Sequence, residues 1–200
     1  MAVERGYTCA AIGATFRPCV SKGHEGGYVM VVRFGICAAV LGALMAGPGA
    51  AQELPAESQA ALEACYYGAE DPAGRAACKD LVFKLCEELP GMTTTMGMMT
   101  CAQQETQAWD VLLNAEYAET MGWAKAMDAQ ERATFPEFAK RAEALLAAQR
   151  AWIAFRDAEC GLAYAVWGSG SMRNIAASAC VADMTAERTL ALRAVRDEMP

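Results

Sequence analysis

The stretch that decides the fold is Ala148-Gln-Arg-Ala-Trp-Ile-Ala-Phe-Arg-Asp-Ala-Glu-Cys160. Residues three and four positions apart lie on one face of a helix. A face of this kind starts just before the stretch and continues beyond it, and its members are Leu145, Gln149, Trp152, Arg156, Cys160 and Ala163. The pattern predicts a long amphipathic helix that ends near Trp167, where Gly168-Ser-Gly-Ser171 interrupts it.

We expect this helix to begin near Thr134, a favourable N-cap residue. Glu137 stands three residues later as the capping-box partner, and Pro136 falls in the first turn, where a missing N–H costs nothing. Two further long helices are predicted on either side, over residues 98–127 and 173–198. Their apolar stripes are Trp109, Leu113, Tyr117 and Met121 in the first, and Val181, Met184, Arg188, Leu192, Val195 and Met199 in the second.

A shorter helical hairpin is predicted ahead of these helices, in residues 52–92. Its helices span residues 56–68 and 72–89, with Asp71-Pro72 as N-cap and first helical residue and Pro90-Gly91 as the stop. Short connections favour antiparallel neighbours. The fold class is therefore all-α: a small antiparallel bundle of three long helices running up, down and up in residues 93–200, with the hairpin added to it.

The segment 30–51 has the pattern of a secretory signal peptide. Arg33 is followed by an apolar run from Phe34 to Ala46, which is shorter than the roughly 20 residues that span a bilayer. Small residues, Gly49 and Ala51, precede a cut before Gln52. We therefore expect a periplasmic or secreted protein without a stable membrane anchor.

Residues 1–29 precede this signal and contain Cys9, Cys19 and the single histidine, His24. We expect Met30 to be the true start and residues 1–29 to be an upstream extension that is absent from the mature protein.

The mature chain is strongly acidic. The whole sequence has a net charge of -7, with 17 Lys+Arg and 24 Asp+Glu. Residues 1–51 hold four of those cations and two of the carboxylates, which leaves 13 against 22 and a charge of -9. This balance argues against nucleic acid or anionic lipid and favours a cationic partner.

Six of the nine cysteines fall in the mature chain: Cys65, Cys78, Cys86, Cys101, Cys160 and Cys180. An even number in an exported chain predicts disulfides, and no CxxC pair or later histidine supports a zinc site. Many pairings are possible. Neighbouring helix ends favour Cys65–Cys78, Cys86–Cys101 and Cys160–Cys180.

Polar residues interrupt the predicted apolar faces. Either Arg156 or Arg188 is expected to meet Asp110, Asp157 or Asn114 between helices, because a charge near a core must be paired. The alternative is a polar ligand pocket. The tryptophans are expected in the core, with Trp167 as a possible exposed exception beside the glycine turn. The methionines at 96, 98 and 99 favour flexible packing over a Cu(I) site.

Catalysis finds little support in the mature sequence. It has no histidine to serve as a general base and no nucleophile elbow or phosphate loop. The carboxylates Glu87, Glu88, Glu116 and Glu119 are interpreted as solvated helix surface. We expect no enzyme, no cofactor and no bound metal.

Two blocks of sequence resemble the LprI-type lysozyme inhibitor domain. Residues 99–117 resemble its first half, in which a cysteine precedes an acidic residue and Leu113-Asn114-x-x-Tyr117. Residues 148–160 resemble its AQRAW…RD…C block, and the glycine turn, Cys180, and Thr185-x-x-Arg188 follow in order. The resemblance implies family-motif residues with a structural role at Asp110, Leu113, Asn114, Tyr117, Gln149, Arg150, Trp152, Arg156, Asp157, Thr185 and Arg188.

The resemblance covers about residues 86–195, and the chain departs from the short family form in its added hairpin with Cys65 and Cys78. It implies an exported inhibitor that binds a cationic lysozyme or related muramidase. Two alternatives stay open: an envelope binding or scaffold protein with another partner, and a cell-wall-acting enzyme. The candidate binding loop, closed by Cys160–Cys180, is Trp167, Gly168, Ser169, Gly170, Ser171, Met172 and Arg173. The alternative for this loop is a simple turn between two helices.

Overall fold

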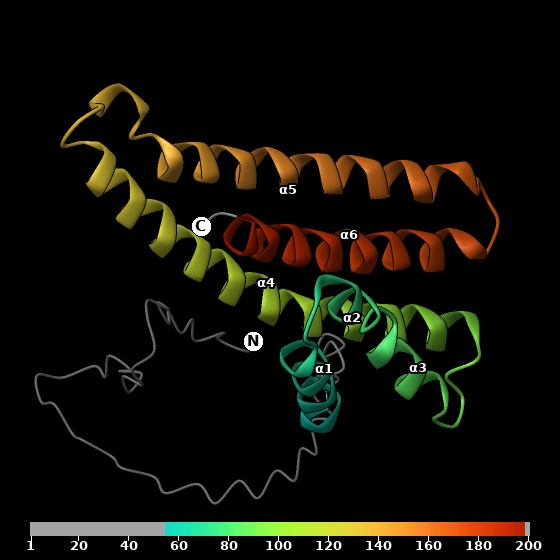
Figure 1. The fold of residues 1–200 in the computed structure, drawn as a ribbon. Helices are drawn as coiled ribbons and strands as arrows, with labels where there is room; N and C mark the ends of the chain where they lie inside the picture. The colour runs from blue at the N-terminus through green and yellow to red at the C-terminus, as the bar shows by residue number, and fades with distance from the viewer. Residues whose placement is uncertain (1–54, 199–200) are drawn as a thin grey trace, which may run out of the picture. The chain divides into compact units, whose positions relative to one another are not determined.

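The computed structural model describes residues 55–198, and within them all regular structure is helical. Three long helices form the body of the protein: α4 (Thr95–Glu131), α5 (Arg141–Val166) and α6 (Met172–Asp197). They run up, down and up, as predicted, and α6 packs against both α4 and α5 (Figure 1). The all-α, disulfide-stapled fold class is confirmed.

The N-terminal section packs across α4 and α6 near the start of α4. It consists of α1 (Ala56–Gly68), α2 (Pro72–Ala76) and α3 (Leu81–Glu87). The prediction of one helix over residues 72–89 was wrong, because the chain turns at Asp80, whose φ is 65°. The carboxylate of Glu105 in α4 accepts hydrogen bonds from the backbone N–H groups of Asp80 and Phe83. A buried side chain of another helix thus closes the N-terminus of α3.

One hydrophobic core joins this section to the bundle. The ring of Tyr66 in α1 meets Trp109 in α4 edge to face, with centroids 5.9 Å apart. Around this pair lie Leu62, Cys78, Val82, Ala108, Leu112 and Ala186. Because the core draws on α1, α3, α4 and α6, removal of the hairpin would expose Trp109.

The predicted stripe on α4 was correct at Trp109 and Leu113 but wrong further along. Tyr117 and Met121 are half-buried, whereas Glu116, Thr120 and Ala124 are buried. An α-helix has 3.6 residues per turn, so a strict four-residue spacing drifts by about 40° at each step. Beyond Leu113 the buried face shifts by one position, to Glu116, Thr120, Ala124 and Asp128.

The start of α5 also differs from the prediction. Residues Pro136–Phe138 form a short 3-10 turn, and α5 begins only at Arg141. Asp128 of α4 accepts hydrogen bonds from the backbone N–H groups of Arg141 and Ala142, at 2.9 and 3.0 Å. The N-terminus of α5 is therefore closed by α4, and Thr134 is not its N-cap.

Two faces of α6 are in contact with neighbours, so its single predicted stripe was incomplete. Its fully buried residues include Thr185 and Thr189, whose hydroxyls donate to the carbonyl oxygens of Val181 and Thr185 in their own helix. Val195, which the stripe included, is exposed.

Three disulfides staple the helices: Cys65–Cys78, Cys86–Cys101 and Cys160–Cys180. These are the pairs that neighbouring helix ends favoured. In the described part of the chain, no helix combines the length and the apolar character needed to cross a membrane. The predicted extension, the signal peptide and Met199 lie outside the described residues.

Candidate functional site

A cluster of arginine and tryptophan lies between α5 and α6. The guanidinium carbons of Arg156 and Arg188 lie 5.0 and 5.9 Å from the centre of the Trp152 ring. The Nε of Arg188 also donates to Oε1 of Gln149 at 2.9 Å. Burial lowers the pKa of Arg188 below its ordinary value. The contacts of Arg188 with Trp152 and Gln149 join α6 to α5, whereas the Arg156–Trp152 contact lies within α5.

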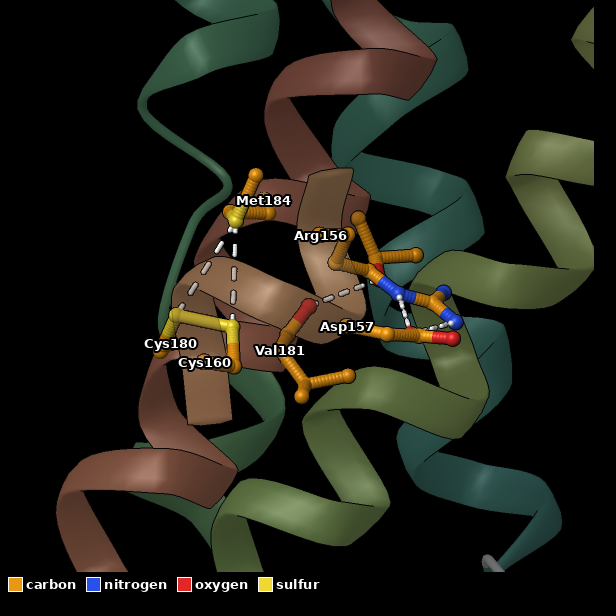
Figure 2. The surroundings of a disulfide bond; sticks show 7 residues. Arg156, Asp157, Cys160, Cys180, Val181 and Met184 are labelled. Atoms are coloured by element: carbon orange, nitrogen blue, oxygen red, sulfur yellow. Dashed lines mark hydrogen bonds and ion pairs between the residues drawn. A yellow bond between two sulfur atoms is a disulfide. The ribbon is translucent and has the colours of Figure 1, made fainter. Parts of the chain in front are cut away.

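The expected ion pairing between helices takes a different form in this cluster. Arg156 bonds its own chain neighbour, Asp157, at 2.9 Å (Figure 2). Asn114 donates to Asp110 one turn earlier in α4, at 3.1 Å. The prediction that Arg156 or Arg188 would meet Asp110, Asp157 or Asn114 between helices was therefore wrong. The contact across the helices is Arg188 with Gln149.

The buried ion pair between helices involves Glu116, which sequence reasoning had placed on the surface. Glu116 is only 2% exposed and bonds the guanidinium of Arg196 in α6. The hydroxyl of Tyr66 donates to Glu116 at 3.1 Å, and burial beside this carboxylate raises the pKa of Tyr66. Glu116 stands three residues after Leu113 and four before Thr120. This spacing, which places it on the buried side of α4, was the available signal in the sequence.

Other motif residues are distributed between core and surface. Leu113 and Thr185 are buried, Tyr117 is half-buried, and Arg150 is exposed. Leu113 and Thr185 thus contribute to the packing of α4 and α6. Arg150 contacts no carboxylate among the ion pairs of the described residues, so its side chain is available on the surface of α5.

The candidate loop forms the tip where α5 turns into α6. Gly168 has a φ of 53°, a left-handed conformation that glycine adopts readily. The N–H of Gly170 donates to the carbonyl oxygen of Trp167 at 2.8 Å, which closes the turn. Nη1 of Arg173 donates back to the carbonyl oxygen of Gly168 at 3.2 Å, and its guanidinium lies over the ring of Tyr164.

A disulfide supports this tip from behind. Cys160 in α5 and Cys180 in α6 are joined, with Cα atoms 5.4 Å apart, and the sulfur of Met184 packs against both (Figure 2). We call the segment from Val166 to Arg173 the tip. Its turn is shaped by the φ of Gly168 and by the bonds of Gly170 and Arg173, and the disulfide ties α5 to α6 further along the two helices.

Large apolar side chains on the tip face solvent. Val166 is 74% exposed, Trp167 48% and Met172 38%. Trp109, in contrast, is buried in the core, while Trp123 and Trp152 are half-buried. The expectation that Trp167 is the exposed tryptophan therefore agrees with its observed exposure. Exposed apolar groups on a rigid projection are suited to protein contact.

Among residues 55–198, no three His, Cys, Asp or Glu side chains come close enough together to hold a metal ion. A hollow of about 490 Å³ lies between α4, α5 and α6, beside Trp123 and Leu145, at the opposite end of α5 from the tip. The tip itself is the projecting end of a helical hairpin (Figure 1).

Comparison with known proteins identifies the family to which the chain is similar. The lysozyme inhibitor LprI family matches residues 86–192, which run from the end of α3 through most of α6. An uncharacterized protein of Rhizobium meliloti (strain 1021) is 37% identical over 98 residues, which cover 49% of this chain and 70% of that protein. No solved structure matches the chain.

The family match includes the arginine–tryptophan cluster, two of the three disulfides and the tip. The added hairpin of α1 and α2, with the Cys65–Cys78 disulfide, precedes the matched region. The chain belongs to the lysozyme inhibitor LprI family.

Proposed function

We propose that this protein is exported and that it binds and blocks a cationic lysozyme or a related muramidase. Membership of the lysozyme inhibitor LprI family is the observation that carries this proposal. The three disulfides support export, because such bonds persist in oxidising compartments. Since the family is named for inhibition, the proposal includes no catalytic step.

The charge of the chain supports a cationic target. The sequence that follows Ala51 has 13 Lys+Arg and 22 Asp+Glu, and thus a net charge of -9. Opposite charges on two proteins raise the rate of encounter and lower the chance of a wrong partner. We therefore expect inhibition to weaken as salt concentration rises.

The tip is the part of the surface that we place against the target. A muramidase binds its polymer in a cleft, and a projecting, stapled turn with Trp167 and Met172 exposed can fill such a cleft. A loop that is already ordered loses little entropy on binding. Inhibition would follow from occupancy of the cleft by the tip, without any covalent reaction.

The test is lysis of a peptidoglycan suspension by a cationic animal-type lysozyme, in the presence of increasing amounts of the oxidised, exported protein. Dose-dependent inhibition that disappears on reduction would support the proposal. If a micromolar excess of the protein inhibits neither this lysozyme nor bacterial lytic enzymes, the proposal is contradicted. Capture of another envelope protein in that case would favour the scaffold alternative, and release of fragments by the pure protein would favour the enzyme.

A further inference from the structure

A second exposed turn lies at the same end of the bundle as the tip. It connects α3 to α4, and we call residues 87–96 the second turn. Glu87 of this turn, Ala102 of α4 and Ala179 of α6 line one hollow of about 260 Å³, so the end of α3 meets the first parts of α4 and α6 there. Because α4 and α6 run in the same direction, the tip and the second turn project from one end of the three long helices (Figure 1).

Local contacts order the second turn. Oγ1 of Thr94 accepts a hydrogen bond from the N–H of Gly97 at 3.0 Å and thereby caps the start of α4. Gly97 is buried against the backbone of Met92, which occupies the space that a side chain on Gly97 would need. The Cys86–Cys101 disulfide ties the end of α3 to α4 behind the turn. The second turn therefore has little conformational entropy to lose when a partner binds.

Large apolar side chains of the second turn face solvent, as they do on the tip. Leu89 is 50% exposed and Met96 is 66% exposed. Exposed apolar groups that gather at one end of a protein mark a site of contact with another molecule. The unbranched side chain of methionine adapts to the shape of the surface that it meets. The two turns together thus offer a wider apolar surface than the tip alone.

The charge around the second turn indicates the kind of partner. Residues 85–124 contain six carboxylates and no Lys or Arg. Glu87 and Glu88 are exposed, and neither takes part in the ion pairs of the described residues. The one cation of the tip is Arg173, which is bonded to Gly168. An apolar surface edged with negative charge fits a cationic protein and repels nucleic acid and anionic lipid.

The region that matches the family includes both turns. The match begins at Cys86, the residue before the second turn, and runs to residue 192, beyond the tip. The α1 and α2 hairpin lies outside it. The part of the chain that carries the family resemblance is therefore the part that builds this end of the bundle.

We propose that the second turn is a second contact with the cationic muramidase, beside the contact made by the tip. This inference rests on the proposed function and extends it. While the tip occupies the cleft, Leu89 and Met96 pack against the surface next to the cleft, and Glu87 and Glu88 approach its basic side chains. The apolar contact mainly slows dissociation, whereas the two carboxylates mainly speed association.

The apolar contact is tested by two double variants of the oxidised, exported protein. Leu89→Ser with Met96→Ser should raise the inhibition constant for the cationic animal-type lysozyme by about fivefold or more, mainly through faster dissociation. Phe135→Ser with Phe138→Ser is the matched control, because these side chains are 51% and 64% exposed in the turn between α4 and α5, at the opposite end. The control should inhibit as the unchanged protein does, and equal urea midpoints would show that both variants are folded.

The charged contact has its own pair of variants. Glu87→Gln with Glu88→Gln should slow association with the lysozyme by about threefold or more at low salt, and this difference should shrink as salt rises. Glu119→Gln with Glu143→Gln removes the same charge from exposed carboxylates elsewhere on α4 and α5. This control should slow association less, because its charges lie away from the proposed contact.

Hydrogen exchange of the complex provides a readout that needs no substitution, since the amides of residues 88–96 should be protected when lysozyme is bound. The inference is overturned, while the proposed function stands, if the unchanged protein inhibits, both second-turn variants match their controls and residues 88–96 gain no protection. A loss of inhibition confined to the Phe135 and Phe138 variant would place the contact at the opposite end and would also overturn it. If the unchanged protein neither binds nor inhibits the lysozyme, the proposed function fails and this inference fails with it.

Discussion

Arg173 donates from Nη1 to the carbonyl oxygen of Gly168, 3.2 Å away, while its guanidinium covers the ring of Tyr164 at 5.4 Å. One side chain of α6 therefore holds both the turn and the last part of α5. These contacts order the tip, and therefore the proposed inhibitory surface, before the target binds.

Replacement of Arg173 by alanine should loosen the tip while the bundle stays folded. Since a disordered loop must be ordered on binding, we expect lysozyme inhibition to weaken by about three- to tenfold. Hydrogen exchange should become faster at residues 168–171. Arg173→Lys keeps the charge without the planar fork and should recover only part of the inhibition. Unchanged exchange in Arg173→Ala would show that this contact does not order the turn.

Loss of Arg196 should destabilise the whole fold. Arg196→Ala leaves the buried carboxylate of Glu116 with only the more distant guanidinium of Arg193, 3.7 Å away, so we expect a loss of unfolding free energy below the about 3–5 kcal/mol of a fully broken buried pair. Urea denaturation measures this change. Glu116→Gln with Arg196→Met should be less destabilising than Arg196→Ala, since no charge is left behind. Equal losses in the two variants would argue that packing, and not the ion pair, is responsible.

Asp128 should make the stability of the fold depend on pH in the acid range. Burial by itself would raise the pKa of Asp128, but the N–H groups of Ala142 and Arg141 and the Arg141 guanidinium hold it below its ordinary value of 3.8. Its contribution to stability is therefore complete above about pH 4 and is lost as pH falls through the lowered pKa.

The stability difference between the unchanged protein and Asp128→Asn measures this effect. It should be constant at neutral pH and should shrink below about pH 4, when thermal unfolding is followed from pH 7 to pH 2. Glu119→Gln, at an exposed carboxylate of the same helix, is the control and should show no such trend. A difference that stays the same down to pH 2 would show that the N-terminal contacts of α5 do not depend on the charge of Asp128.

The Cys160–Cys180 disulfide should contribute about 2–4 kcal/mol to the unfolding free energy. Cys160→Ala with Cys180→Ala should therefore lower the urea midpoint and also weaken inhibition, because the disulfide supports the tip. Cys65→Ala with Cys78→Ala is the matched comparison, since that disulfide lies outside the region that matches the family. We expect a comparable loss of stability from it and little change in inhibition at a temperature where both variants are folded.

The sequence predicted those features that depend on local spacing. The face of α5 that contacts α6, the three long helices and the turn at Gly168 all follow from residues close together in the chain. Helix boundaries set by distant residues could not be predicted in this way. Asp128 determines where α5 begins and Glu105 determines where α3 begins, and each acts from α4.

The candidate site was predictable to a similar extent. The exposure of Trp167 followed from its place beside two glycines. The role of Arg173 did not, because its bond to Gly168 depends on the path of the turn. Glu116 was missed because glutamate is usually solvated, and only its position between Leu113 and Thr120 indicated that it is buried.

The most direct test of the proposed function is the inhibition constant for lysozyme-driven lysis, compared among three forms of the exported protein. These are the unchanged protein, Trp167→Ala with Met172→Ala at the tip, and Val111→Ala at an equally exposed residue on α4. If the tip occupies the cleft, the tip variant should lose at least tenfold in inhibition, about 1.4 kcal/mol, while Val111→Ala remains unchanged. Equal inhibition by all three forms would contradict the placement of the tip against the target, and no inhibition by the unchanged protein would contradict the proposed function itself.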